Sequence, residues 1–143
     1  MSHLLALPAG LAAAAVAYLI NRSALRRLGG RALWLAIPVL EETFKTGLAI
    51  LAGASVVSTH AVFGAVEAVY EVSGRRPSVT AAGLALMTHA LLGLLTASLI
   101  SPGRPAAFAV GSAAAVHTAY NLLVTGRAAS SKGNPPNREG GER

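Results

Sequence analysis

The sequence predicts an all-α integral membrane protein, a bundle of about five transmembrane helices. The chain has 143 residues, of which 53% are hydrophobic, and its mean hydropathy is positive. These values are typical of small helical membrane proteins and high for a soluble domain. Five apolar runs, separated by polar or glycine- and proline-containing breaks, have lengths near that of a membrane span. Cysteine is absent, which excludes disulfides, thiolate metal sites and cysteine nucleophiles.

The acidic residues are placed unusually. The chain contains no Asp and six Glu, and only Glu139 and Glu142 lie in the polar C-terminal part. The other four lie within or at the edge of apolar runs: Glu41, Glu42, Glu67 and Glu71. A charged side chain at bilayer depth costs roughly 3 kcal/mol on insertion scales, so such residues usually mark a functional site. The net charge of +6 comes from arginines beside apolar runs, which favours anionic lipid headgroups over nucleic acid as their partner.

The first apolar run, 4–20, is expected to be a retained helix. A secretory signal would have Lys or Arg before its apolar run, and here none precedes it. Residues 21–31 contain four arginines and predict a basic loop. The second run, about 32–57, contains the acidic pair, has Trp34 near its entry and is long enough to span with tilt.

The third run, 58–72, is short for a span. Residues 73–78 predict a turn, with Ser78 at the start of the fourth run, 79–100. After a break at 101–105, the fifth run covers 106–124. Residues 1–124 thus form the transmembrane domain, and the polar residues 125–143 are expected to be a disordered cytoplasmic tail.

The basic residues predict the orientation. Four fall between the first two runs, none in the next break, two in the third, one in the fourth and four in the tail. By the positive-inside rule, the N-terminus lies outside and the C-terminus in the cytoplasm. We therefore expect a multi-pass protein of a prokaryotic plasma membrane.

Ionisable residues on four of the runs are expected at similar depth. At about 1.5 Å per helical residue, Glu41, Glu67, His89 and His117 all lie roughly 8 to 15 Å from the cytoplasmic ends of their helices. Spacings of three and four residues align polar and aromatic side chains on one stripe of each helix. These stripes are Glu41 with Lys45, Phe63 with Glu67 and Tyr70, and His117 with Asn121.

Each residue also has a purely structural interpretation. Lys45 could neutralise Glu41 as an ion pair within its helix, His89 could serve as a packing hydrogen-bonder, and His117 with Asn121 could be an interhelical clamp. His60 lies near an uncharged outer break and is expected at the membrane interface. Glu71 is expected to be a solvated carboxylate at a helix end.

Two carboxylates, two imidazoles and a carboxamide at one depth suffice for hydrolysis without a covalent intermediate. A buried Glu can take a proton from water, while a histidine and an amide N–H stabilise the oxyanion. No Gly-x-Ser-x-Gly or His-Glu-x-x-His pattern occurs, which argues against a serine hydrolase and the common zinc proteases. No cofactor is expected; zinc is the less favoured option, with Glu41, His89 and His117 as its ligands.

Taken in order, these segments resemble a known group of enzymes. Glu41-Glu42-Thr-Phe-Lys45, Phe63-Gly-Ala-Val-Glu67, His89 and His117-Thr-Ala-Tyr-Asn121 resemble the four motifs of the PrsW-type intramembrane proteases. That group is related to the CAAX-prenyl (CPBP, Abi-type) proteases and, more distantly, to the APH subunit of gamma-secretase. The resemblance covers about residues 32–124.

The resemblance implies a four-helix catalytic core, a glutamic-type peptidase that cleaves a membrane-bound protein substrate. Glu41 would be the water-activating base and Glu42 its partner, His117 and Asn121 would form the oxyanion side, and His89 would assist the water. Lys45, Phe63, Glu67 and Tyr70 would support them. The CAAX-type members have a histidine where this chain has Glu67, which argues against a prenyl-cysteine substrate.

Two rival functions use the same residues. A non-catalytic scaffold subunit would keep the fold and the polar core, while a proton- or ion-coupled transporter would use intramembrane Glu and His directly. The expected partners are the protein substrate and membrane lipids, with no nucleic acid; an oligomer or a partner subunit is compatible with so short a chain.

Overall fold

The computed structural model describes residues 1–132, apart from the side chains of Leu35 and of residues 125–132. This part of the chain is helical, with one isolated β-bridge between Ser2 and Ala54 and no strand. The elements are α1 (Ala6–Leu28), a 3-10 turn η1 (Gly29–Arg31), α2 (Ala32–Leu35), α3 (Ile37–Leu51), α4 (Val56–Ser73), α5 (Val79–Leu99) and α6 (Ala106–Lys132). The all-α prediction is confirmed for these residues.

Helix α1 is longer than the predicted run. It continues through Leu28, so most of the predicted basic loop is helical. Arg26 and Arg27 lie in its last turn, where cations interact favourably with the helix dipole. The chain leaves the helix at Gly29, whose φ of 58° suits a residue without a side chain.

The predicted second run, about 32–57, is not one continuous helix. The helix is interrupted at Ala36, between α2 and α3, because Pro38 has no N–H to continue the backbone ladder. It then ends at Leu51, where the Ala54 N–H donates to the Ala49 carbonyl at 2.8 Å around Gly53, whose φ is 64°. This is the usual glycine-terminated helix end.

Serine side chains begin the next two helices. The Ser55 hydroxyl accepts from the Ser58 N–H at the start of α4, and Ser78 accepts from the Ala81 N–H at 3.1 Å at the start of α5. The predicted role of Ser78 is confirmed. Helix α6 continues past Val124 to Lys132, so the predicted tail begins as helix; its residues 133–143 lie outside the described part.

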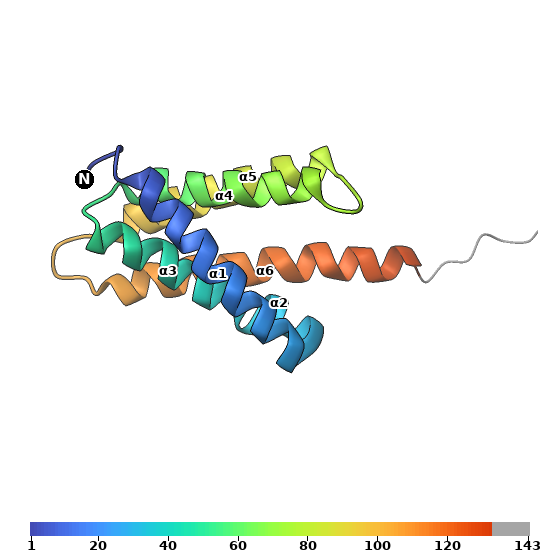
Figure 1. The fold of residues 1–143 in the computed structure, drawn as a ribbon. Helices are drawn as coiled ribbons and strands as arrows, with labels where there is room; N and C mark the ends of the chain where they lie inside the picture. Colours follow the sequence, from blue (N-terminus) through green and yellow to red (C-terminus); the bar gives the residue numbers. More distant parts are fainter. Residues whose placement is uncertain (133–143) are drawn as a thin grey trace, which may run out of the picture.

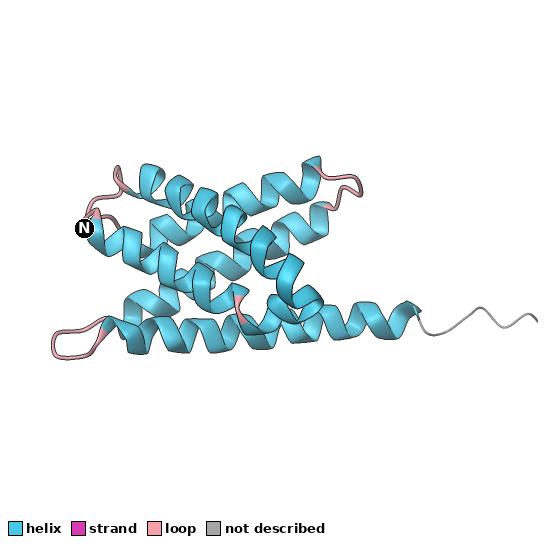
Figure 2. Cartoon of the chain, turned by 60° about the horizontal axis from the view of Figure 1, so that its bottom comes forward, coloured by secondary structure: helices cyan, strands magenta, loops and turns pink. Residues whose placement is uncertain are grey.

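Long helices that follow one another in the chain run antiparallel (Figure 1). Helices α4 and α5 lie side by side, α1 crosses α3 and α4, and α6 packs against α3 and α5 (Figure 1). A second view shows the crossing of α1 over the other helices (Figure 2). The backbone of Ser2 ties the N-terminal segment to the turn after α3, by hydrogen bonds of 2.9 Å to the Gly53 carbonyl and from the Ser55 N–H.

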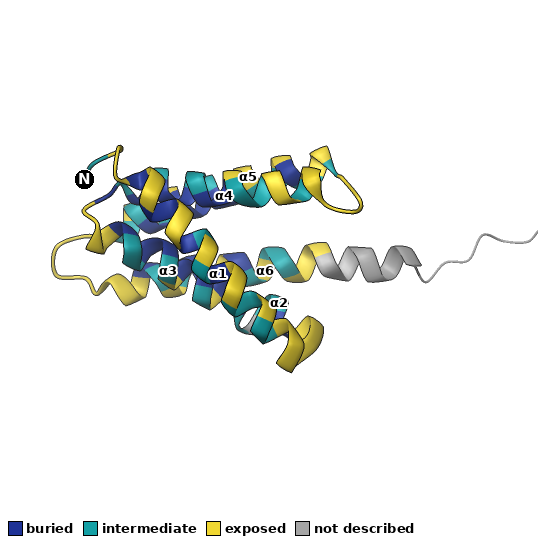
Figure 3. Ribbon diagram, in the orientation of Figure 1, coloured by how far each residue is buried: buried dark blue, intermediate teal, exposed yellow. Residues whose placement is uncertain are grey.

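Several ionisable side chains are buried in this fold, and many large apolar side chains are exposed. Buried segments gather where the helices meet (Figure 3), and the largest fully buried side chains include Lys45, His60, His89 and Glu42. Large apolar residues such as Leu19, Leu91 and Phe108 are exposed. Two segments, Val79–Leu99 and Ala106–Val124, are long and apolar enough to cross a membrane, judged by length and composition alone.

Candidate functional site

Glu42 is the centre of a buried polar cluster. Its side chain is fully buried, and its Oε1 accepts hydrogen bonds from Lys45 Nζ at 2.5 Å and from His117 Nδ1 at 3.1 Å. Its Oε2 lies 3.1 Å from His60 Nε2. These three partners come from α3, α4 and α6, so Glu42 joins three helices through charge-assisted hydrogen bonds.

Lys45 links this cluster to His89 on α5. Its Nζ lies 2.9 Å from His89 Nδ1, and because an ammonium can only donate, Nδ1 must be the acceptor. The ring proton of neutral His89 then sits on Nε2, which donates to Glu67 Oε2 at 2.5 Å. The side chain of Glu67 is 44% exposed. A continuous chain of hydrogen bonds therefore runs from buried Glu42 to the partly exposed Glu67.

Glu41 points away from its neighbour, toward α1. Its Oε1 accepts from Asn21 Nδ2 at 2.6 Å, and the described residues give its Oε2 no partner. Lys45 therefore pairs with Glu42 and not, as the simple ion-pair interpretation has it, with Glu41. Glu41 is buried but retains an oxygen that can bind another molecule.

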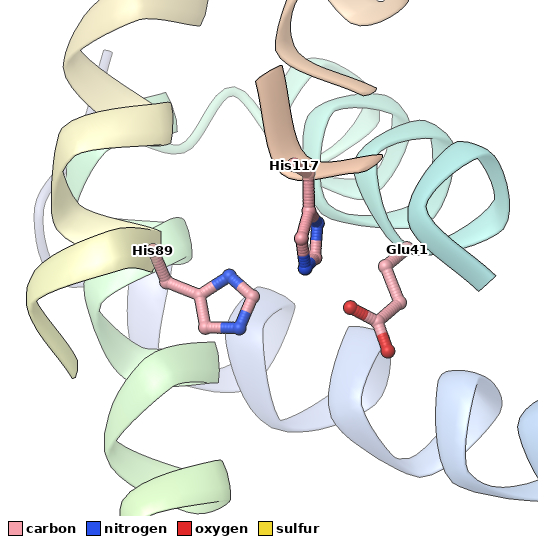
Figure 4. Close-up of side chains that lie close together, drawn as sticks. All are labelled: Glu41, His89 and His117. Atoms are coloured by element: carbon pink, nitrogen blue, oxygen red, sulfur yellow. The ribbon is translucent and has the colours of Figure 1, made fainter. Parts of the chain in front are cut away.

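Glu41, His89 and His117 converge on one point from α3, α5 and α6 (Figure 4). A carboxylate oxygen of Glu41 and one ring nitrogen of each histidine lie within 4.8 Å of one another. A point equidistant from three atoms at that separation is roughly 2.8 Å from each, a hydrogen-bond distance. The group is thus spaced to hold a water molecule.

Zinc fits this arrangement poorly, although the donor types are those of catalytic zinc sites. His117 could offer Nε2, with Nδ1 held by the Glu42 carboxylate as metal-bound histidines often are. His89 has both ring nitrogens in hydrogen bonds, to Lys45 and to Glu67. A metal would have to displace one of these two hydrogen bonds of His89, close to the buried Lys45 ammonium. The reaction described below therefore uses no metal.

Two cavities adjoin the site on opposite sides of Glu67. One, of about 110 Å³, lies between α1, α3 and α4 and is lined by Asn21, Glu41 and Phe63 among others. The second, of about 190 Å³, lies between α4, α5 and α6 and is lined by His89 and His117. Glu67 lines both cavities. The site is thus reachable from two directions.

The remaining predicted residues lie around this centre. Phe63 packs edge-on against His89, with ring centroids 5.0 Å apart, and Lys45 Nζ lies 4.6 Å from the Phe63 ring centroid. Tyr70 stacks on Tyr18 of α1 at 5.9 Å. Asn121 lines the second cavity and donates from Nδ2 to the Leu33 carbonyl at 2.8 Å. This hydrogen bond links α6 to α2.

Two residues of the site were missed by sequence reasoning. His60 was expected at the interface, but it is fully buried and contacts Glu42, because α4 begins before it and packs tightly on α5. Asn21 was assigned to the basic loop, but it lies in α1 and contacts Glu41. Its position at the end of an apolar run was the one available signal.

No family model, curated protein or solved structure matches this chain.

Proposed function

We propose that the protein is a multi-pass membrane peptidase that hydrolyses a peptide bond of a membrane-bound protein with water activated by Glu41. The membrane setting is supported by the distribution of side chains. Ionisable side chains such as Glu42, Lys45 and His89 are buried among small apolar residues, while many leucines are exposed, an arrangement stable in lipid and unfavourable in water. The two apolar segments in α5 and α6 agree with it.

The observation that carries the chemistry is the convergence of Glu41, His89 and His117. The Glu41 Oε2 atom has no partner among the described residues. His117 donates from Nδ1 to Glu42, so its Nε2 is an acceptor when the ring is neutral. A water between these two acceptors donates a hydrogen to each, which leaves its oxygen lone pairs free to attack a carbonyl.

The reaction then follows as general base and general acid catalysis. The water oxygen attacks the carbonyl carbon as Glu41 takes its proton, and His117 accepts the second hydrogen bond. Glu41 next returns the proton to the amide nitrogen, the C–N bond breaks, and an amine and a carboxylic acid leave. In this scheme His117 holds the attacking water; from sequence it was expected on the oxyanion side.

Glu42 and Lys45 act through the histidines. Glu42 fixes the tautomer and the orientation of His117, as the carboxylate of a catalytic triad does for its histidine. Lys45 does the same for His89 from the other side. In this proposal Glu42 acts by orienting His117; from sequence it was expected to be the partner of Glu41.

The cavity between α1 and α4 favours an apolar substrate segment. Its wall beside Glu41 is formed largely by Ala14, Ala17, Tyr18 and Val66. A peptide bond carried by a membrane-embedded segment could reach Glu41 from this side, whereas a soluble, highly charged peptide would have to bury its charges.

The test is cleavage of a panel of single-span membrane peptides by the purified protein in bilayers. Glu41→Gln keeps the shape of the side chain and removes the base, so cleavage is expected to vanish. Glu142→Gln, the same change in the polar C-terminal residues, is the matched control and should cleave normally. Zinc content is assayed on the same sample. Undiminished cleavage by Glu41→Gln would show that Glu41 is not the base. If Glu41→Gln loses cleavage and the parent protein contains stoichiometric zinc, a metal mechanism is indicated instead.

A proton-coupled transporter is the second candidate, because a chain of hydrogen bonds links Glu42 through Lys45 and His89 to Glu67. On the other side of Glu42 the chain meets His60, which is fully buried and whose Nδ1 donates to the Val56 carbonyl. That end is closed, so the path does not cross the molecule. A proton flux in proteoliposomes that depends on Glu67 would favour transport.

A further inference from the structure

His60 is fully buried and makes two hydrogen bonds. Its Nδ1 lies 2.9 Å from the Val56 carbonyl, which can only accept, so Nδ1 carries a proton. Its Nε2 faces Glu42 Oε2 at 3.1 Å. A hydrogen bond between these two atoms requires a second proton, held on Nε2 or on the carboxyl oxygen. The His60 contact thus lies on the Oε2 side of Glu42, whereas Lys45 and His117 both contact Oε1.

His60 and His89 are positioned by the same packing arrangement. Both begin a His-x-x-x-Gly segment, His60 to Gly64 on α4 and His89 to Gly93 on α5. An added Cβ at Gly93 would lie 2.7 Å from the Cβ of His60, and one at Gly64 would lie 2.9 Å from the Cβ of His89. In this antiparallel pair (Figure 1), each glycine makes room for the histidine of the other helix.

This packing fixes the Glu42 carboxylate from the side opposite His117. Oε2 of Glu42 is held by His60, and Oε1 is held by Lys45 and His117. Because both oxygens of the Glu42 carboxylate are held, the position of the oxygen to which His117 Nδ1 donates depends on His60. The Nδ1 atom of His117 is two hydrogen bonds away from His60.

We propose that His60 is a positioning residue that orients His117 through Glu42. The inference rests on the proposed peptidase function, because His117 is the group whose orientation that reaction uses. His60 belongs neither to the water site nor to the residues that line the two cavities, and its effect is on the geometry of the catalytic histidine.

The experiment compares two substitutions of His60 in the full-length protein in bilayers. His60→Leu fills the space without a donor, while His60→Gln keeps an N–H that can reach Glu42. We expect His60→Leu to lower kcat by roughly 10- to 100-fold, the usual effect of removing a group that orients a functional histidine, with KM little changed and the pH profile of kcat displaced. His60→Gln should recover most of the rate. His3→Leu, a change at an exposed histidine whose Nδ1 lies 2.8 Å from Ser58 Oγ, should cleave normally.

A second readout does not depend on cleavage. The Nδ1–H proton of His117, observed by NMR of protein labelled with ¹⁵N at histidine, should be present in the parent protein and shifted or lost in His60→Leu. If the parent cleaves no peptide and the resonance still responds, the peptidase proposal fails while the positioning role stands. An unchanged kcat together with an unchanged resonance overturns the positioning role. If His60→Leu does not fold, Gly93→Ala, which displaces the His60 ring without removing it, should lower kcat and shift the resonance; an effect on neither would overturn the inference.

Discussion

Two adjacent glutamates have different tasks because successive residues of a helix point about 100° apart. Glu42 faces the histidines of α4 and α6, and both of its carboxylate oxygens lie within hydrogen-bond distance of protein groups. Glu41 faces α1, and one of its oxygens, beside a cavity, has no partner among the described residues. The first is suited to hold other groups in place, and the second to exchange a proton with a bound molecule.

This difference predicts that Glu42→Gln mainly lowers stability, whereas Glu41→Gln mainly removes activity. Glu42→Gln leaves the Lys45 ammonium buried without its counter-ion, and removing one partner of a buried pair typically costs about 3–5 kcal/mol. We expect a loss of that size in the free energy of unfolding, measured by denaturant titration in mixed micelles. Glu41→Gln, whose Asn21 partner can still donate to an amide oxygen, should lose much less.

Replacing both charges at once tests whether Lys45 and Glu42 stabilise each other. Glu42→Gln combined with Lys45→Met removes the uncompensated ammonium, so the double variant should be more stable than Glu42→Gln alone. Equal stability of the single and double variants would show that Lys45 and Glu42 are not coupled.

At the scale of elements, the contact between α4 and α5 depends on two glycines. Gly64→Ala would place a Cβ 2.9 Å from His89 and 3.3 Å from the Ala85 carbonyl oxygen, so backbone must move. We expect a destabilisation of about 1–3 kcal/mol and a lower rate of cleavage, since His89 is displaced.

Gly83→Ala on α5 is the matched control. Nothing lies within 4 Å of a Cβ added at Gly83, so the substitution should change stability by at most about 1 kcal/mol, in the stabilising direction. The free energies of unfolding of the two variants, measured side by side, check the prediction. Equal effects would mean that the α4–α5 approach is not set by Gly64.

Element boundaries show how far the sequence leads. Depth counting placed Glu67 and His89 at similar depth, and the structure shows them hydrogen-bonded. His60 was expected at the membrane interface, because a glycine and serine stretch gives no sign that α4 starts at Val56 or that Gly93 approaches it. Close approach depends on the register between helices, and a single sequence carries no direct record of register.

The α1 boundary was missed for a different reason. Clustered arginines indicate a loop when they are counted as charges, but they also stabilise the last turn of a helix. The two effects leave the same pattern in the sequence. Only packing against α3 and α4 decides between them, and that packing brings Asn21 to Glu41.

At the scale of the molecule, buried ionisable side chains together with exposed large apolar ones predict a lipid-embedded bundle. The chain has no cysteine, so single cysteines report on one place each. A membrane-impermeant maleimide should label Ser101→Cys in intact cells, Gly74→Cys only after the membrane is opened, and Leu91→Cys in neither case. Labelling of Leu91→Cys in intact cells would contradict burial of α5 in lipid, and the parent chain controls for background.

Helix α1 lies outside the segment that carries the four motifs, yet it supplies Asn21 and one wall of the cavity beside Glu41. A piece of the chain defined by those motifs alone, from Ala32 onward, would retain every motif residue and lose this wall. We therefore expect that a transplanted site or a trimmed chain has the activity proposed above only when α1 is present, the helix that a motif search passes over.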